Sequence, residues 1–181
     1  MRAAKTGTTL VLTFSLFESR LLQHILKQIL ANYQIKPEQL DAKSASAWYS
    51  TRGCPGAEMS DEETRDWLTT LHQYKSANVQ HLANWLGRLS IPKAAEGQLR
   101  LKLQDASVLL TALNDHRLLM AARHDIGQEE MDIRTVSALS KLQPDQHTAL
   151  CEIQFLSGII EEILWHLPGS PGNWGEGLRP R

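Results

Sequence analysis

A short polar cluster interrupts an otherwise apolar helical segment in the second half of the chain. Asn114, Asp115 and Arg117 stand among leucines that recur at helical spacing. Arg117 falls on the apolar stripe of that segment, so we expect its side chain to point at least partly inward. A buried guanidinium without a partner is costly, so Arg117 requires a carboxylate or carbonyl group. Asp115 points elsewhere on the helix, and the partner must therefore come from another element.

The expected partner of Arg117 is a glutamate from one of two distant segments. The candidates are Glu161 and Glu162 in the last helical segment and Glu18 near the N-terminus. Two interpretations of the cluster stay open. The favoured one is an internal polar network that fixes how the helices pack. The other is a recognition or anion site, to which Arg123 would contribute.

Other motifs that carry chemistry are missing from the sequence. The seven histidines form neither an H-E-x-x-H pair nor a Glu-x-x-His pair. Glu162 and His166 stand four residues apart, which favours a surface pair over a metal site. The two cysteines, Cys54 and Cys151, form no C-x-x-C motif, and the sequence contains no phosphate-binding loop or nucleophile elbow. No metal or cofactor is therefore expected, and an enzyme is disfavoured.

Hydrophobic periodicity predicts the elements that must position these residues. Segments 9–14 and 98–103 alternate apolar and polar residues and predict two short strands. Period-3.6 patterns predict helices over 15–33, from Pro37, over 60–89, over 105–124, over 131–142 and over 144–167. Capping boxes open two of them, at Ser15 with Glu18 and at Ser60 with Glu63, and Asp105 is expected to cap a third.

These elements predict a mainly α fold, a helical bundle of about five or six helices with two short β-strands. A strand is followed by a helix and a long helix twice, which indicates a weak internal duplication whose two strands pair as a ribbon against helices. In the long helix 61–89 the predicted apolar stripe is Trp67, Leu71, Tyr74, Asn78, Leu82, Trp85 and Leu89. Asn78, the polar residue in this stripe, is expected to hydrogen-bond a neighbouring helix or to set the register.

Length and composition indicate one globular domain. We expect a single domain over 1–167, a loop over 50–59 and a disordered Gly/Pro-rich tail over 168–181. Basic blocks (1–36 and 64–124) alternate with acidic blocks (37–63 and 125–163), and the formal net charge is -1. This balance is not typical of a nucleic-acid-binding protein.

The cysteine usage and the terminal segment bear on localisation. Two cysteines in a chain of this length indicate a reducing compartment. The N-terminal segment resembles the start of a signal peptide but lacks a cleavage site, and no stretch approaches the length of a membrane span. We therefore expect a cytoplasmic protein with no membrane partner.

The polar cluster also carries a family resemblance. Leu113-Asn114-Asp115-His116-Arg117-Leu118, followed by Arg123 and Ile126, resembles the L-N-D-x-R-L signature of a bacterial family, the domain-of-unknown-function family twenty-seventeen. The short strand leading into an E-x-x-L-L helix at Glu18 is similar too, as is a final amphipathic helix with a glutamate at the position of Glu161. The resemblance spans residues 9–167. It implies no established activity. Family members are often encoded beside the adaptor of the Clp protease, and some are labelled transcriptional regulators.

Three functions follow as expectations. The first is a small interaction or regulatory protein linked to Clp-dependent proteolysis. The second is a DNA-binding transcriptional regulator, although the helix 61–89 is not basic enough for a recognition helix. The third is a small-ligand-binding protein or enzyme, which predicts a concave pocket where Asn114, Asp115, Arg117 and Arg123 converge. A homodimer is a further expectation, because Trp67, Trp85 and Trp165 offer large apolar surfaces.

Overall fold

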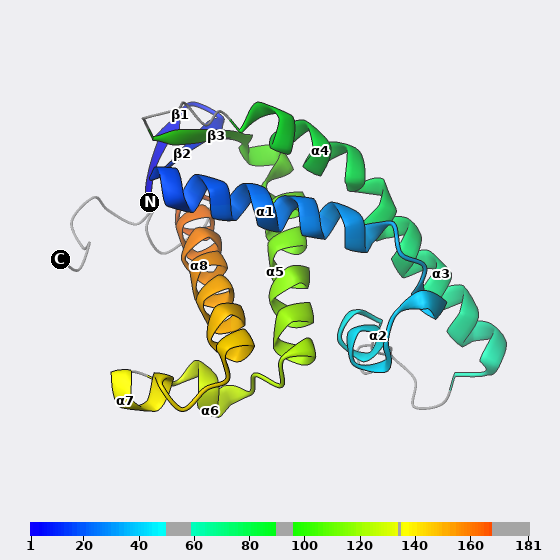
Figure 1. The fold of residues 1–181 in the computed structure, drawn as a ribbon. Helices are drawn as coiled ribbons and strands as arrows, with labels where there is room; N and C mark the ends of the chain where they lie inside the picture. The colour runs from blue at the N-terminus through cyan, green and yellow to red at the C-terminus, as the bar shows by residue number, and fades with distance from the viewer. Residues whose placement is uncertain (50–58, 90–95, 134, 168–181) are drawn as a thin grey trace.

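The computed structural model describes residues 1–49, 59–89, 96–133 and 135–167 (Figure 1). The fold is mainly α with a small antiparallel sheet, as the sequence predicts. The tail 168–181 and nearly all of the loop 50–59, including Cys54, lie outside the described residues. In the described part of the chain, no helix combines the length and the apolar character needed to cross a membrane.

The sheet contains three strands in the order β1-β2-β3. β2 (Thr9–Phe14) and β3 (Gly97–Lys102) are the two predicted strands, and they pair antiparallel as expected. Leu10 lies opposite Leu101, and Leu12 lies opposite Leu99. All four side chains are fully buried, so the alternating pattern does place one face of the sheet in the core.

β1 (Arg2–Thr6) is the strand that sequence analysis missed. It is an edge strand with four of its five residues exposed, so it has no apolar alternation to reveal it. The hairpin to β2 turns at Gly7, whose φ of 59° lies in the left-handed region. Glycine at the first central position is typical of a type II′ hairpin turn.

The first predicted helix is confirmed, whereas the helix predicted from Pro37 is a 3-10 turn there and an α-helix only from Ala42. α1 (Leu16–Tyr33) begins at the predicted capping box, in which Ser15 and Glu18 bond each other's backbone N–H groups. A 3-10 turn, η1 (Pro37–Gln39), leads to the short helix α2 (Ala42–Trp48). The side chain of Asp41 caps α2 by accepting a hydrogen bond from the Ser44 N–H group.

The predicted long helix is divided at Asn78 into α3 (Asp61–Ala77) and α4 (Val79–Arg88). The hydrogen bond expected from Asn78 to a neighbouring helix is not formed, because among the described residues its side chain makes none. The predicted inward stripe is confirmed at Leu71, Leu82, Trp85 and Leu89, but in α3 Leu68 and Lys75 take the places predicted for Trp67 and Tyr74. Tyr74 is 72% exposed, whereas Lys75 is 8% exposed. The inward apolar side chains of these two helices are Leu68, Leu71, Val79, Leu82, Trp85, Leu86 and Leu89.

The second half of the chain supplies the central helices. η3 (Leu103–Asp105) leads into α5 (Ala106–Arg123), although the Asp105 side chain makes no capping hydrogen bond, contrary to the prediction. The predicted segment 131–142 forms two single turns, α6 (Gln128–Met131) and α7 (Val136–Leu139). α8 (Pro144–His166) begins with the predicted proline. α5 and α8 lie side by side, α1 crosses them, and α2 packs against α5 (Figure 1).

Candidate functional site

Asp115 of the polar cluster is the centre of a buried network. It is 8% exposed, and its Oδ2 accepts a hydrogen bond from the Tyr33 hydroxyl at 2.6 Å. The same oxygen lies 2.5 Å from the Lys75 ammonium. The Trp48 indole Nε1 donates to the Asp115 backbone carbonyl at 2.7 Å. These contacts connect α1, α2 and α3 to the middle of α5.

Three aromatic rings surround the Lys75 ammonium. Its Nζ lies 4.9 Å from the ring centroid of Trp48, 5.6 Å from that of Tyr33 and 5.9 Å from that of Tyr49. Such distances stabilise a cation through the negative faces of the rings. Together with Asp115 they compensate the desolvation of a lysine that would otherwise be costly to bury. We call these five residues the Asp115 cluster.

The Asp115 cluster perturbs the two tyrosines that belong to it. Burial and the adjacent Asp115 carboxylate raise the pKa of Tyr33 far above its usual value. Burial, together with the charges of Asp115 and Glu38, raises the pKa of Tyr49 to about 12. Both hydroxyls are therefore protonated at neutral pH, so Tyr33 acts as a donor to Asp115.

The other residues predicted around Asp115 do not join it. Asn114 is exposed on α5, and Glu161 is exposed on α8. Arg117 is half-buried, and its Nε has no hydrogen-bond partner in the described part of the chain. The expected glutamate partner was wrong. Glu18 instead bonds Ser15 and the N-terminal ammonium, and Glu162 lies 3.4 Å from the His166 Nε2.

Arg123 serves a separate contact at the C-terminal end of α5. Its Nε donates to the Ser44 hydroxyl at 2.9 Å, and the same Nε lies 3.9 Å from the carboxylate of Asp41. Hydrogen bonds from Ser44 hold the pKa of the Asp41 carboxyl below its usual value. Arg123 thus ties α5 to the start of α2. The predicted cluster is spread along α5 and does not converge on one pocket.

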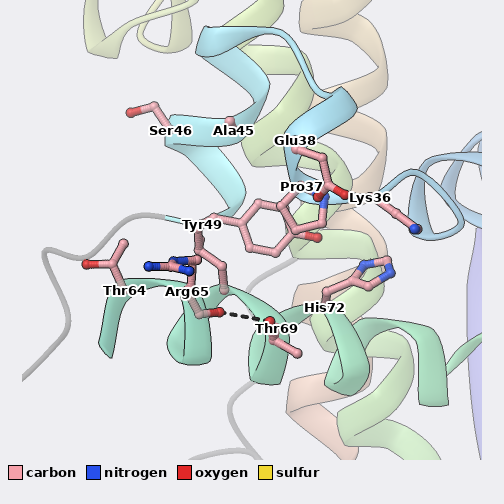
Figure 2. Close-up of a pocket in the computed structure, with 11 residues that line it drawn as sticks. Lys36, Pro37, Glu38, Ala45, Ser46, Tyr49, Thr64, Arg65, Thr69 and His72 are labelled. Carbon is pink, nitrogen blue, oxygen red and sulfur yellow. Dashed lines mark hydrogen bonds between the residues drawn. The ribbon is translucent and has the colours of Figure 1, made fainter. Parts of the chain in front are cut away.

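The structure contains a groove that the sequence did not indicate. It has a volume of about 810 Å³ and lies between η1 and α2 on one side and α3 on the other (Figure 2). We call this cavity the α3 groove. Its lining residues are Lys36, Pro37, Glu38, Ala45, Ser46, Tyr49, Thr64, Arg65, Leu68, Thr69 and His72. Because these positions come from three elements with no common motif, only the folded chain brings them together.

Tyr49 connects the α3 groove to the Asp115 cluster. Its ring lines the groove and also lies against the Lys75 ammonium. Lys75 is the one residue of α3 that is buried, so the position of this groove wall depends on the Asp115 cluster. In the described residues, no group of three or more His, Cys, Asp and Glu side chains could hold a metal ion.

Comparison with protein families agrees with the resemblance carried by the polar cluster. The family model described as Domain of unknown function (DUF2017) matches residues 1–165. The chain belongs to the DUF2017 family. Comparisons with curated proteins and with solved structures gave no match. In this DUF2017 member, Asp115 of the L-N-D-x-R-L segment joins α5 to three other helices.

Proposed function

We propose that this DUF2017 member is a small interaction and regulatory protein that binds a segment of a partner protein in the α3 groove. The observation that carries the proposal is the groove itself. Its α3 wall runs from Thr64 to His72, which corresponds to about 12 Å at the helical rise per residue. That length accommodates about two turns of a partner helix.

The nature of the walls favours recognition through side chains. η1, α2 and α3 are helical, so their interior backbone groups are bonded within each element and offer no strand edge for pairing. The floor contains apolar side chains such as Pro37, Leu68 and the ring of Tyr49. An amphipathic helix that inserts apolar side chains is the partner segment that fits such a groove best.

The biological context of the proposal comes from the family resemblance. Members of this family are often encoded beside the Clp protease adaptor, so we propose that the partner belongs to Clp-dependent proteolysis in the cytoplasm.

A capture experiment with matched variants tests the proposal. Thr69→Trp introduces a large side chain into the groove, whereas Thr70→Trp introduces the same side chain at an exposed neighbouring position outside the lining. We expect the wild type and Thr70→Trp to capture the Clp adaptor or a protease subunit from bacterial lysate, and Thr69→Trp to lose it. Equal capture by both variants, or capture of neither component by the wild type, contradicts the proposal.

A small apolar ligand is the second candidate occupant. The volume of about 810 Å³ lies within the range of small-molecule pockets. This alternative predicts that a co-purified small molecule is present in the wild type and missing from Thr69→Trp, as native mass spectrometry would show.

A further inference from the structure

The charged residues of the α3 groove are arranged at its two ends. Arg65 lies at one end, and Lys36 and His72 lie at the other, with the ring of Tyr49 between them (Figure 2). Glu38 is the single carboxylate in the lining. The acidic residues of the first turn of α3 are not part of the lining. The groove therefore combines an apolar middle with basic side chains at both ends, and Glu38 adds one acidic side chain beside Lys36.

These basic side chains have no carboxylate partner in the part of the chain that the structure describes. The Arg65 side chain makes one hydrogen bond there, from its Nε to the Asp61 carbonyl at 3.3 Å. Lys36 and His72 form no ion pair. Elsewhere in the fold, Lys43 and Lys75 each lie beside an aspartate. Among the described residues, the basic side chains at the groove ends thus form no ion pair.

His72 adds a second observation at one end. Its Nδ1 is buried and has no hydrogen-bond partner among the residues that the structure describes. Buried polar atoms in folded proteins are nearly always hydrogen-bonded, so the His72 ring keeps unused hydrogen-bonding capacity at this end of the groove. An imidazole beside a lysine favours an anionic acceptor such as a carboxylate.

We infer that the α3 groove selects a protein segment whose apolar side chains are flanked by acidic side chains at both ends. This inference rests on the proposed function and specifies the partner. The apolar face would pack on Tyr49 and Leu68, one carboxylate would meet Arg65, and the other would meet Lys36 and His72. In a helical segment, carboxylates about 12 Å apart are separated by about eight residues.

Selection from a peptide library tests this charge preference on the full-length protein. The probe is a phage-displayed library of random peptides of about twelve residues. We expect selected peptides to be apolar with Asp or Glu near both ends. Against the variant Lys36→Glu/Arg65→Glu, the selected ends should change to Lys or Arg. A synthetic peptide selected on the wild type should bind this variant about tenfold more weakly.

The matched control reverses two charges outside the groove. Arg100→Glu/Lys102→Glu alters two exposed residues of β3 and should leave peptide affinity unchanged. The inference is overturned if both double variants weaken peptide binding equally. It is also overturned if the library yields no peptide, or yields peptides without acidic ends. If peptides without acidic ends still lose binding in Thr69→Trp, the proposed function survives and only the charge preference fails. If the selected peptides bind Thr69→Trp as tightly as the wild type, both the proposed function and the charge preference are wrong.

Discussion

At the residue scale, Lys75 shows how a charged side chain can occupy a core position. Its ammonium is removed from water but gains the Asp115 carboxylate at 2.5 Å and the faces of three aromatic rings. The pair holds α3 to α5, and the remaining residues of α3 are exposed or half-buried. The attachment of this helix therefore depends strongly on one interaction.

Removal of one partner leaves the other buried without compensation. We expect Lys75→Met to lower the free energy of unfolding by about 3 kcal/mol, since it leaves Asp115 uncompensated. The double variant Lys75→Met/Asp115→Leu should lose less than the sum of the single variants, because neither charge then remains buried. Urea denaturation of the three variants measures this coupling. Lys27→Met, at an exposed position of α1, is the control. Additive losses would exclude a stabilising pair.

Tyr49 predicts a loss of stability at alkaline pH. Its pKa is raised to about 12 in the folded protein, against about 10 in an unfolded chain. The contribution of the protonated Tyr49 hydroxyl to the free energy of unfolding is complete below pH of about 10. It is lost as the pH rises toward 12, because in that range the unfolded state releases the proton and the folded state keeps it. We expect Tyr49→Phe to reduce the slope of unfolding free energy against pH in this window. Ultraviolet titration of tyrosinate should follow the same group, and an unchanged slope in Tyr49→Phe would contradict the assignment.

At the element scale, two helices begin with reciprocal capping boxes, and the one on α3 matters for the groove. Ser60 and Glu63 bond each other's backbone N–H groups at the start of the helix. Hydrogen bonds from the Ser60 backbone and side chain hold the pKa of the Glu63 carboxyl below its usual value. A helix with little buried surface depends more than most on such local contacts.

Glu63 therefore predicts an acid-dependent contribution to stability. Because the pKa of Glu63 is lowered in the folded state, its carboxylate contributes to the free energy of unfolding above the unfolded pKa of about 4.5. This contribution is lost as the pH falls through the pKa of the folded state. We expect Glu63→Gln to be less stable than the wild type at neutral pH and equal to it at pH about 2. Glu62→Gln, in the same first turn but outside the box, should have a smaller effect at neutral pH. Urea unfolding at both pH values checks the difference, and a pH-independent difference would rule out the box as its cause.

At the scale of the whole molecule, the apolar interior of the described residues is divided into two clusters. The larger one lies under the sheet and includes residues of α1, α4, α5 and α8. The smaller one gathers Ile126, Ala149, Leu150 and Ile153 where the end of α5 meets the start of α8. Met131 of α6 and Leu139 of α7 pack against it. A small separate cluster of this kind can open without unfolding of the larger core.

This division predicts local unfolding of α6, α7 and the start of α8, which pack around the smaller cluster. Ile153→Ala should cost about 2–5 kcal/mol locally, because it leaves a cavity in the smaller cluster. We expect faster hydrogen exchange in α6 and the first half of α8, while the amides of β2 and β3 stay protected. Leu12→Ala, in the larger core, should instead accelerate exchange throughout the protein. Uniform acceleration by Ile153→Ala would show that the two clusters unfold as one.

Local signals explain which parts of the fold could be predicted. α1, β2, β3 and α8 each combine a clear periodicity with a cap, a turn or a proline, so their boundaries follow from neighbouring residues. β1 was missed because an exposed edge strand needs no apolar pattern. The face of α3 was misplaced by one position because Lys75 reads as a surface residue until Asp115 and the aromatic rings are brought around it. Membership of the DUF2017 family was also predictable, from the segment around Asn114, Asp115 and Arg117.

The sequence by itself determined the helical character, the strands β2 and β3, the capping boxes of α1 and α3, and the family. Only the tertiary structure decided that Asp115 pairs with Lys75, that Arg117 has no glutamate partner among the described residues, and that a groove lies beside α3. The reason is physical. Periodicity and capping depend on residues within one or two helical turns, whereas the cluster and the groove are built from segments far apart in the chain. Their side chains meet only after the helices have packed, and no local pattern specifies that meeting.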